Sequence, residues 1–186
     1  GEGFGIDNRA VVRNQGVYGW TVFDQLNFNY RKNGFDLSGM LYGGNLRDGY
    51  DQFFVIDTYL DKLWRQNLSL PNQIFKTKQI EALLSLNYQF NENHSMGARF
   101  NWEKTPASYW LVNQFAQTFS GNQLYEDLHS NVVGNEPEGY RKANFYYSGK
   151  VKNWSIDFNA DGLWSDAENT QVAEEEILGG INEAVN

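Results

Sequence analysis

"LNYQFNENHSMGARFNW", residues 86–102, alternates apolar and polar side chains on both sides of a short polar turn. Because successive side chains of a strand point to opposite faces, this alternation predicts two β-strands joined by a tight hairpin. Extended slightly upstream, the apolar face of this hairpin holds Ala82, Leu84, Leu86, Tyr88, Phe90, Met96, Ala98, Phe100 and Trp102. The opposite face holds Ser85, Asn87, Gln89, Ser95, Arg99 and Asn101.

Two further segments repeat the pattern. Residues 25–42 alternate around Lys32-Asn33-Gly34, and Asn-Gly is the strongest short hairpin signal since both residues tolerate a positive φ. Residues 143–163 alternate around Lys152-Asn153. Together with the hairpin near 80–103, these predict three hairpins whose turns lie about 60 residues apart. The turns are short, whereas the joining segments, residues 43–78 and 104–142, are long.

The remaining segments complete the predicted fold. Phe4–Val12 reads as one more strand, which gives an all-β antiparallel meander of about seven strands over residues 1–164. Residues 165–186 lose the alternation and become acidic, so they are expected to form a loop or tail, with Val172–Leu178 as a possible part of a helix. Asp51–Leu70 has a helix-like spacing of apolar residues, although it is equally compatible with an extension of the strand pair.

Composition excludes several classes of protein. The chain has 186 residues, enough for one domain, and its net charge of −8 argues against general nucleic-acid binding. It has no cysteine and therefore no disulfide framework or thiolate chemistry. No run of 18 or more apolar residues exists, so no membrane-spanning helix is expected. Transmembrane β-barrels also have low mean hydropathy, because half of their strand residues face a polar interior.

The two faces of the predicted sheet distinguish a membrane wall from a soluble sheet. The polar face is rich in Asn, Gln, Ser and Tyr with scattered charges, which suits a hydrated lumen or a plug contact. On the apolar face, the aromatics near the turns resemble an interfacial girdle: Tyr30, Phe35, Phe90 and Trp154. Short turns at one end and long connections at the other are typical of outer-membrane barrels. The alternative is a soluble or surface-exposed β-sandwich binding module, possibly for glycans, whose apolar face is buried.

The hairpins "LNFNYRKNGFDLSG", "LNYQFNENHSMGARFNW" and "ANFYYSGKVKNWSIDFNADGLW" resemble the barrel region of the TonB-dependent outer-membrane receptors of Bacteroidetes-type bacteria, within the outer membrane protein beta-barrel family. The opening "GEGFGI" is similar to the stretch where such chains leave the plug and enter the barrel. The resemblance implies an arc of a larger transmembrane barrel in the bacterial outer membrane, which imports a substrate. It also implies that the chain is a fragment, because a complete member has an N-terminal domain, a plug and roughly three times as many strands.

The same resemblance defines the expected partners. These are outer-membrane lipid and an energy-coupling complex, the latter reached through an N-terminal part that this chain lacks. The isolated fragment is expected to self-associate, since its sheet edges and apolar face would be open. No catalytic triad or cofactor motif occurs, so the chain is not expected to be an enzyme or to hold a cofactor.

Candidate binding residues are few. Aromatic side chains in the long connections suit contact with a sugar or an apolar ligand, and they are Trp64, Tyr109, Trp110, Phe115 and Tyr125. His94 and His129 stand apart from one another in the sequence and have no ligand spacing around them, so no metal site is expected.

Overall fold

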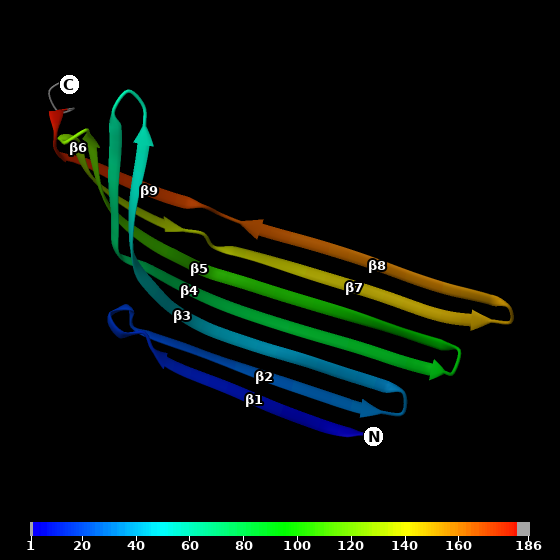
Figure 1. The fold of residues 1–186 in the computed structure, drawn as a ribbon. Coiled ribbons are helices and arrows are strands. Elements are labelled where there is room, and N and C mark those ends of the chain that lie inside the picture. The colour runs from blue at the N-terminus through cyan, green and yellow to red at the C-terminus, as the bar shows by residue number, and fades with distance from the viewer. Residues whose placement is uncertain (1, 182–186) are drawn as a thin grey trace.

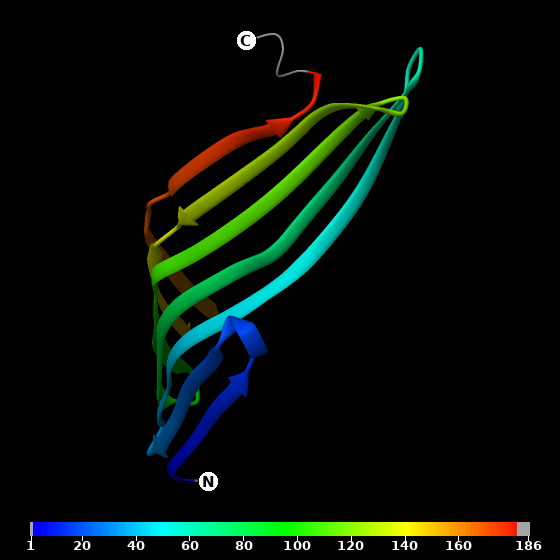
Figure 2. The same cartoon turned by 90° about the vertical axis from the view of Figure 1, so that its left-hand side faces the viewer.

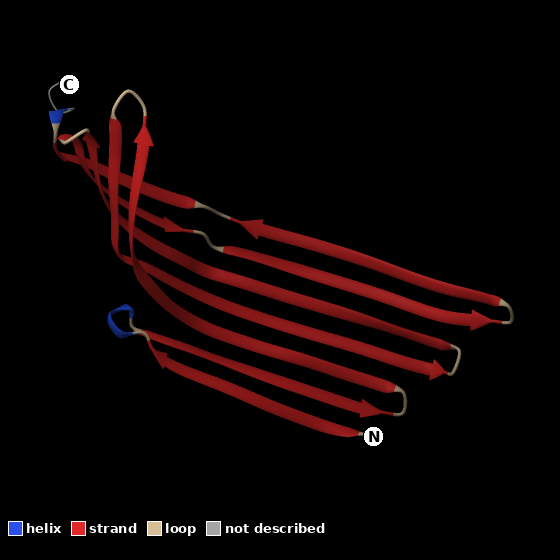
Figure 3. Ribbon diagram, in the orientation of Figure 1, coloured by secondary structure: helices blue, strands red, loops and turns tan. Residues whose placement is uncertain are grey.

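The computed structural model describes residues 2–181 and consists almost entirely of antiparallel strands (Figures 1 and 3). One 3₁₀ turn, η1, interrupts the chain between the first two strands. The elements in order are β1 (Gly3–Asn14), η1 (Gly16–Tyr18), β2 (Trp20–Lys32), β3 (Phe35–Tyr59), β4 (Leu63–Asn91), β5 (His94–Ser120), β6 (Gln123–Asn135), β7 (Glu138–Val151), β8 (Trp154–Ala167) and β9 (Thr170–Gly179).

All nine strands of the described chain belong to one curved, open sheet (Figure 2). The order β1-β2-β3-β4-β5 follows the sequence, and β5 then pairs with β7 along one half and with β6 along the other. β8 continues the sheet beyond β7, and β9 continues it beyond β6. The sheet is therefore seven strands wide, which confirms the predicted antiparallel meander of about seven strands and its open arc.

The three predicted turns lie together at one end of the sheet (Figure 1). Asn33 and Gly34 have φ values of 51° and 78°, as the two central residues of a two-residue hairpin require. Lys152 likewise has a φ of 55°. The connections at the opposite end are also short, because the long segments predicted there are continuous strand rather than irregular loop.

Two expectations from the sequence are corrected here. The helical alternative for Asp51–Leu70 is wrong, since β3 and β4 pair across this whole stretch, from Tyr59 with Leu63 at the hairpin tip to Gln52 with Leu70. Residues 165–186 were expected to form a loop or tail, with a possible helix at Val172–Leu178, but the structure has β9 there, paired with β6. Residues 182–186 lie outside the described part of the chain.

Register shifts divide the sheet into two zones. The shifts near the middle of the long strands fall between Tyr50 and Gln52 on β3, and between Ser69 and Ile74 and between Lys78 and Ile80 on β4. We call residues 3–45, 78–105 and 138–167, which lie toward the three turns, the proximal zone. Residues 46–77, 106–135 and 170–179 form the distal zone, which begins where β5 changes its partner from β7 to β6.

Glycines within the strands mark places where an aromatic ring of a neighbouring strand lies flat on the backbone. A Cβ added at Gly39 would collide with the ring of Phe28, and one at Gly134 would collide with that of Trp110. Cross-strand pairing of an aromatic with glycine compensates for the side chain that glycine lacks. These strand glycines therefore make room for aromatic rings from neighbouring strands.

Candidate functional site

The register places the apolar side chains of the proximal zone on one side of the sheet. We call this side face A, and one row across it, from β1 to β8, consists of Ile6, Phe28, Gly39, Leu84, Phe100, Ala143 and Gly162. The opposite side, face B, carries a row made of Gly5, Asn29, Ser38, Ser85, Arg99, Asn144 and Asp161. The alternation read from the sequence thus extends across the full width of the sheet.

Face A of the proximal zone is apolar and uncovered. Leu84 is 45% exposed, Phe100 42% and Ile156 50%, although all three belong to strands paired on both sides or next to a turn. Monomeric soluble proteins rarely expose a contiguous apolar face of this kind. The described residues form a single sheet and leave this face uncovered.

Aromatic side chains border this apolar surface at both ends. Near the turns stand Tyr30, Phe35, Tyr88, Phe90 and Trp154, and near the distal zone stand Trp20, Trp102 and Trp164. Along β4 the apolar surface runs from Phe90 to Ile80, which is about ten steps of about 3.3 Å. With a strand tilt of about 40° this corresponds to about 25 Å of height, the height of the apolar band of an outer-membrane barrel.

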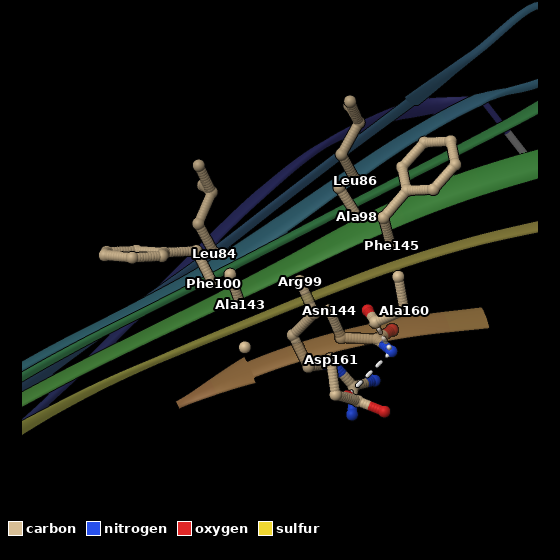
Figure 4. A pocket seen from close by; sticks show the side chains of 11 residues that line it. Leu84, Leu86, Ala98, Arg99, Phe100, Ala143, Asn144, Phe145, Ala160 and Asp161 are labelled. Carbon is tan, nitrogen blue, oxygen red and sulfur yellow. Dashed lines mark hydrogen bonds between the residues drawn. The ribbon is translucent and has the colours of Figure 1, made fainter. Parts of the chain in front are cut away.

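Two shallow hollows lie on face A near β7 and β8. The first, of about 530 Å³, is lined mainly by small and apolar side chains, including Ala98, Phe100, Ala143 and Phe145 (Figure 4). The second, of about 820 Å³, includes Phe100, Trp102, Arg141 and Trp164 and lies where β5 changes partner. Phe100 lines both hollows, so they lie next to each other.

Face B of the proximal zone is held together by polar cross-strand contacts. Tyr146 donates a hydrogen bond to Asn87 (2.6 Å) across β5, which separates their strands, and its ring lies over Gly97. Ser148 donates to Asp157 (2.7 Å), and Tyr140 donates to Glu103 (2.6 Å). Such contacts fix the register of neighbouring strands and leave a hydrogen-bonding surface rather than an apolar one.

In the distal zone the polarity of the two faces changes. Face B now carries a row of Phe54, Leu68, Ala116, Leu128 and Ile177, and Ala116 is the one buried apolar side chain among residues 2–181. Face A carries rows with Asn67, Gln117 and Asp127, and with Asn113, Asn131 and Glu174, beside an apolar row of Ile74, Leu111, Val133 and Val172. On face A the distal zone therefore carries more polar side chains than the proximal zone does.

The structure divides the five predicted binding aromatics between the two faces. Trp64 and Tyr125 stack edge to face with ring centroids 5.1 Å apart, so these two come together. Trp110 lies on face B against Gly134. Tyr109 and Phe115 lie on face A, where Tyr109 receives the ammonium of Lys76 over its ring and Phe115 stacks on His129 at 4.5 Å. The five residues do not form one common site.

The two histidines occupy separate places. His94 Nδ1 lies 2.7 Å from the Tyr147 hydroxyl beside a turn, and His129 Nε2 lies 2.6 Å from the Asn113 amide oxygen in the distal zone. Within residues 2–181 no three His, Asp or Glu side chains gather as a metal ion would need. The described chain also has no helix long and apolar enough to cross a membrane.

An ion pair closes the far end of the β3–β4 hairpin. The Arg65 guanidinium donates two hydrogen bonds to the Asp57 carboxylate, at 2.7 and 2.8 Å. These hydrogen bonds lower the pKa of the Asp57 carboxyl from its usual value, and they raise the pKa of Arg65. Both groups are exposed, so the pair orders the hairpin tip without contributing much to overall stability.

Sequence reasoning missed the alignment of cations on face A, because it depends on register between distant strands. Arg47 pairs with Lys76 across β3 and β4, and Lys78, Lys104 and Arg141 follow along the same border. The only signal in the sequence was the presence of single basic residues just beyond each apolar run. No protein-family model and no curated protein matches the chain.

Proposed function

We propose that this chain forms part of the wall of a transmembrane β-barrel in the bacterial outer membrane, as a segment of a TonB-dependent receptor that imports a substrate. The observation that carries the proposal is the uncovered apolar face A of the proximal zone, which is bordered by aromatics. At the strand tilt of a barrel wall this face would be about 25 Å high. Lipid is the partner that covers such a band without a second protein layer. The transport role and the receptor family rest on the resemblance of the hairpins alone.

The change of polarity in the distal zone supports the same arrangement. A strand that leaves the bilayer meets water on its outer side, so its outer side chains become polar. Face A does so at Asn113, Gln117 and Asp127, beyond the level of Trp102. The polar contacts of face B in the proximal zone suit a wall that lines a hydrated interior.

The alternative, a soluble or surface β-sandwich binding module that takes a glycan, accounts for the alternation equally well. It needs a second sheet packed on face A. The described chain forms one sheet only, so a sandwich would require a second copy or another chain. The aromatic pair of Trp64 and Tyr125, both half-buried, is the feature that favours a glycan, since sugars stack on aromatic rings.

The chain has no cysteine, which permits a direct test by single labels. Leu84→Cys and Leu83→Cys place a fluorophore on neighbouring residues of β4 at the same depth but on opposite faces. In reconstituted vesicles containing lipids brominated near the middle of their chains, we expect strong quenching for the Leu84→Cys label and weak quenching for the Leu83→Cys label. Absence of quenching at both positions, or equal quenching at both, contradicts the proposal.

A further inference from the structure

Five cations form a continuous line across face A, and we call this line the basic belt. It consists of Arg47 on β3, Lys76 and Lys78 on β4, Lys104 on β5 and Arg141 on β7. Arg47 is the direct partner of Lys76, Lys104 is the partner of Ile80, and Arg141 is the partner of Trp102. The belt therefore runs along the border between the proximal and distal zones.

The belt is unusual for a chain with a net charge of −8, because it holds five of the fifteen Lys and Arg residues in one line. Lys78, Lys104 and Arg141 are exposed, and Arg47 and Lys76 are half-buried. Among residues 2–181, neither of the two ion pairs involves a belt residue. Two acidic side chains share the face A row of Lys104: Asp24, through Gly43 and Ile80, and Asp166, through Gly139. The belt thus has five cations with one carboxylate at each end of that row, and its net charge is positive.

The position of the belt defines what it meets. It lies immediately beyond the apolar band, at the level of Trp102 and Trp164, where the headgroups of a lipid leaflet stand if face A contacts lipid. Anionic headgroups attract such cations, and each Lys or Arg near the surface strengthens the attraction. One hollow holds Arg141 and Trp102, and the adjoining hollow extends from Phe100 to Ala143, so an acyl chain seated in the second would lie below a headgroup bound at the belt.

We propose that the basic belt binds the phosphate groups of anionic lipids in the leaflet on the distal side of the membrane, a proposal that rests on the lipid-facing role of face A. Arg47 and Arg141 present planar donor forks that suit phosphate oxygens, and the three lysines add point charges between them. Lys76 is held over the Tyr109 ring, so its ammonium is positioned at the interface.

The test measures local lipid preference beside the belt. A fluorophore on Leu41→Cys lies on face A two positions from Gly43, whose partner is Ile80, and therefore just below the belt. Vesicles contain phosphatidylcholine with about one third phosphatidylglycerol, and either lipid carries the bromine. We expect brominated phosphatidylglycerol to quench this label several-fold more strongly than brominated phosphatidylcholine, with the preference decreasing as salt is raised.

The chain offers a matched pair of charge variants. One variant combines R47Q, K78Q, K104Q and R141Q within the belt. The other combines R9Q, R13Q, K142Q and K150Q, which all lie on face B. Each variant therefore removes two arginines and two lysines. We expect the belt variant to lose this several-fold preference and the face B variant to keep it.

Two outcomes overturn the proposal: no preference for the anionic lipid in the unaltered chain, or an equal loss of preference in both variants. A label on Leu84→Cys serves as the control for insertion in every sample. If that label is not quenched by either lipid, the lipid-facing role of face A fails. If it is quenched while the Leu41→Cys label shows no preference, the belt proposal alone fails.

Discussion

Replacement of Leu84 by arginine is the substitution whose cost follows most directly from the structure. Leu84 stands on face A, is 45% exposed and pairs with Gly39 and Phe100. It lies within one residue of the middle of the apolar band between Ile80 and Phe90. An arginine at the midplane of the lipid-facing side of a barrel costs about 2–4 kcal/mol. We therefore expect Leu84→Arg to lower the free energy of unfolding by this amount.

Leu83→Arg is the matched control, since it makes the same change one residue away on face B. Leu83 is half-buried between Met40 and Asn101, so an arginine there keeps its charge toward the polar side and loses only part of the leucine packing, about 1 kcal/mol. The assay is reversible urea unfolding of the chain in lipid vesicles. Equal losses for the two variants, or a larger loss for Leu83→Arg, would refute the reasoning.

Three further predictions concern topology, pH and association. Single cysteines at Asn33 and Asn122 lie at opposite ends of the sheet, so a membrane-impermeant reagent should label only one of them on intact cells; equal labelling contradicts this. The lowered pKa of Asp57 means that its ion pair with Arg65 is complete above the ordinary pKa of an aspartate and is lost as the pH falls through the folded-state value. The protection of amides at the β3–β4 tip, measured relative to the intrinsic exchange rate at each pH, should therefore decrease in acid, and Asp57→Asn should remove this decrease. In detergent-free buffer we expect the chain to self-associate, as measured by light scattering. A stable monomer would favour the β-sandwich.

The proximal zone could be predicted from the sequence because its information is local. Alternation with a period of two and turns such as Asn33-Gly34 identify strands without knowledge of their neighbours. Every hairpin predicted in this way is present, and the assignment of Leu84, Phe100 and Ile156 to one face follows from the register.

The distal zone could not be predicted, since its strands owe their structure to pairing rather than to pattern. Phe53, Ile56 and Leu60 have a spacing that a helix also satisfies, and only the partner strand from Leu63 onward decides between the two. β9 is rich in glutamate and has little strand propensity, but it pairs with β6 over most of its length.

The basic belt could not be predicted from the sequence for a related reason. Arg47 and Arg141 are 94 positions apart, and their alignment passes through the register shifts near Lys78 and Lys104. A shift of one residue would move a cation to face B. The aromatics of the long segments could be found by composition, but their division between two faces depends on the same register.

A nitroxide scan along β5, one residue at a time, with oxygen and a water-soluble relaxing agent as probes, tests whether face A of the proximal zone contacts lipid. From Met96 to Trp102 we expect a period of two, with the face A positions accessible to oxygen and the face B positions accessible to the aqueous agent. At Asn113 and Phe115, which are also on face A but in the distal zone, we expect access for the aqueous agent. A lipid pattern that continued unchanged to Phe115, or its absence from Met96 to Trp102, would contradict the account.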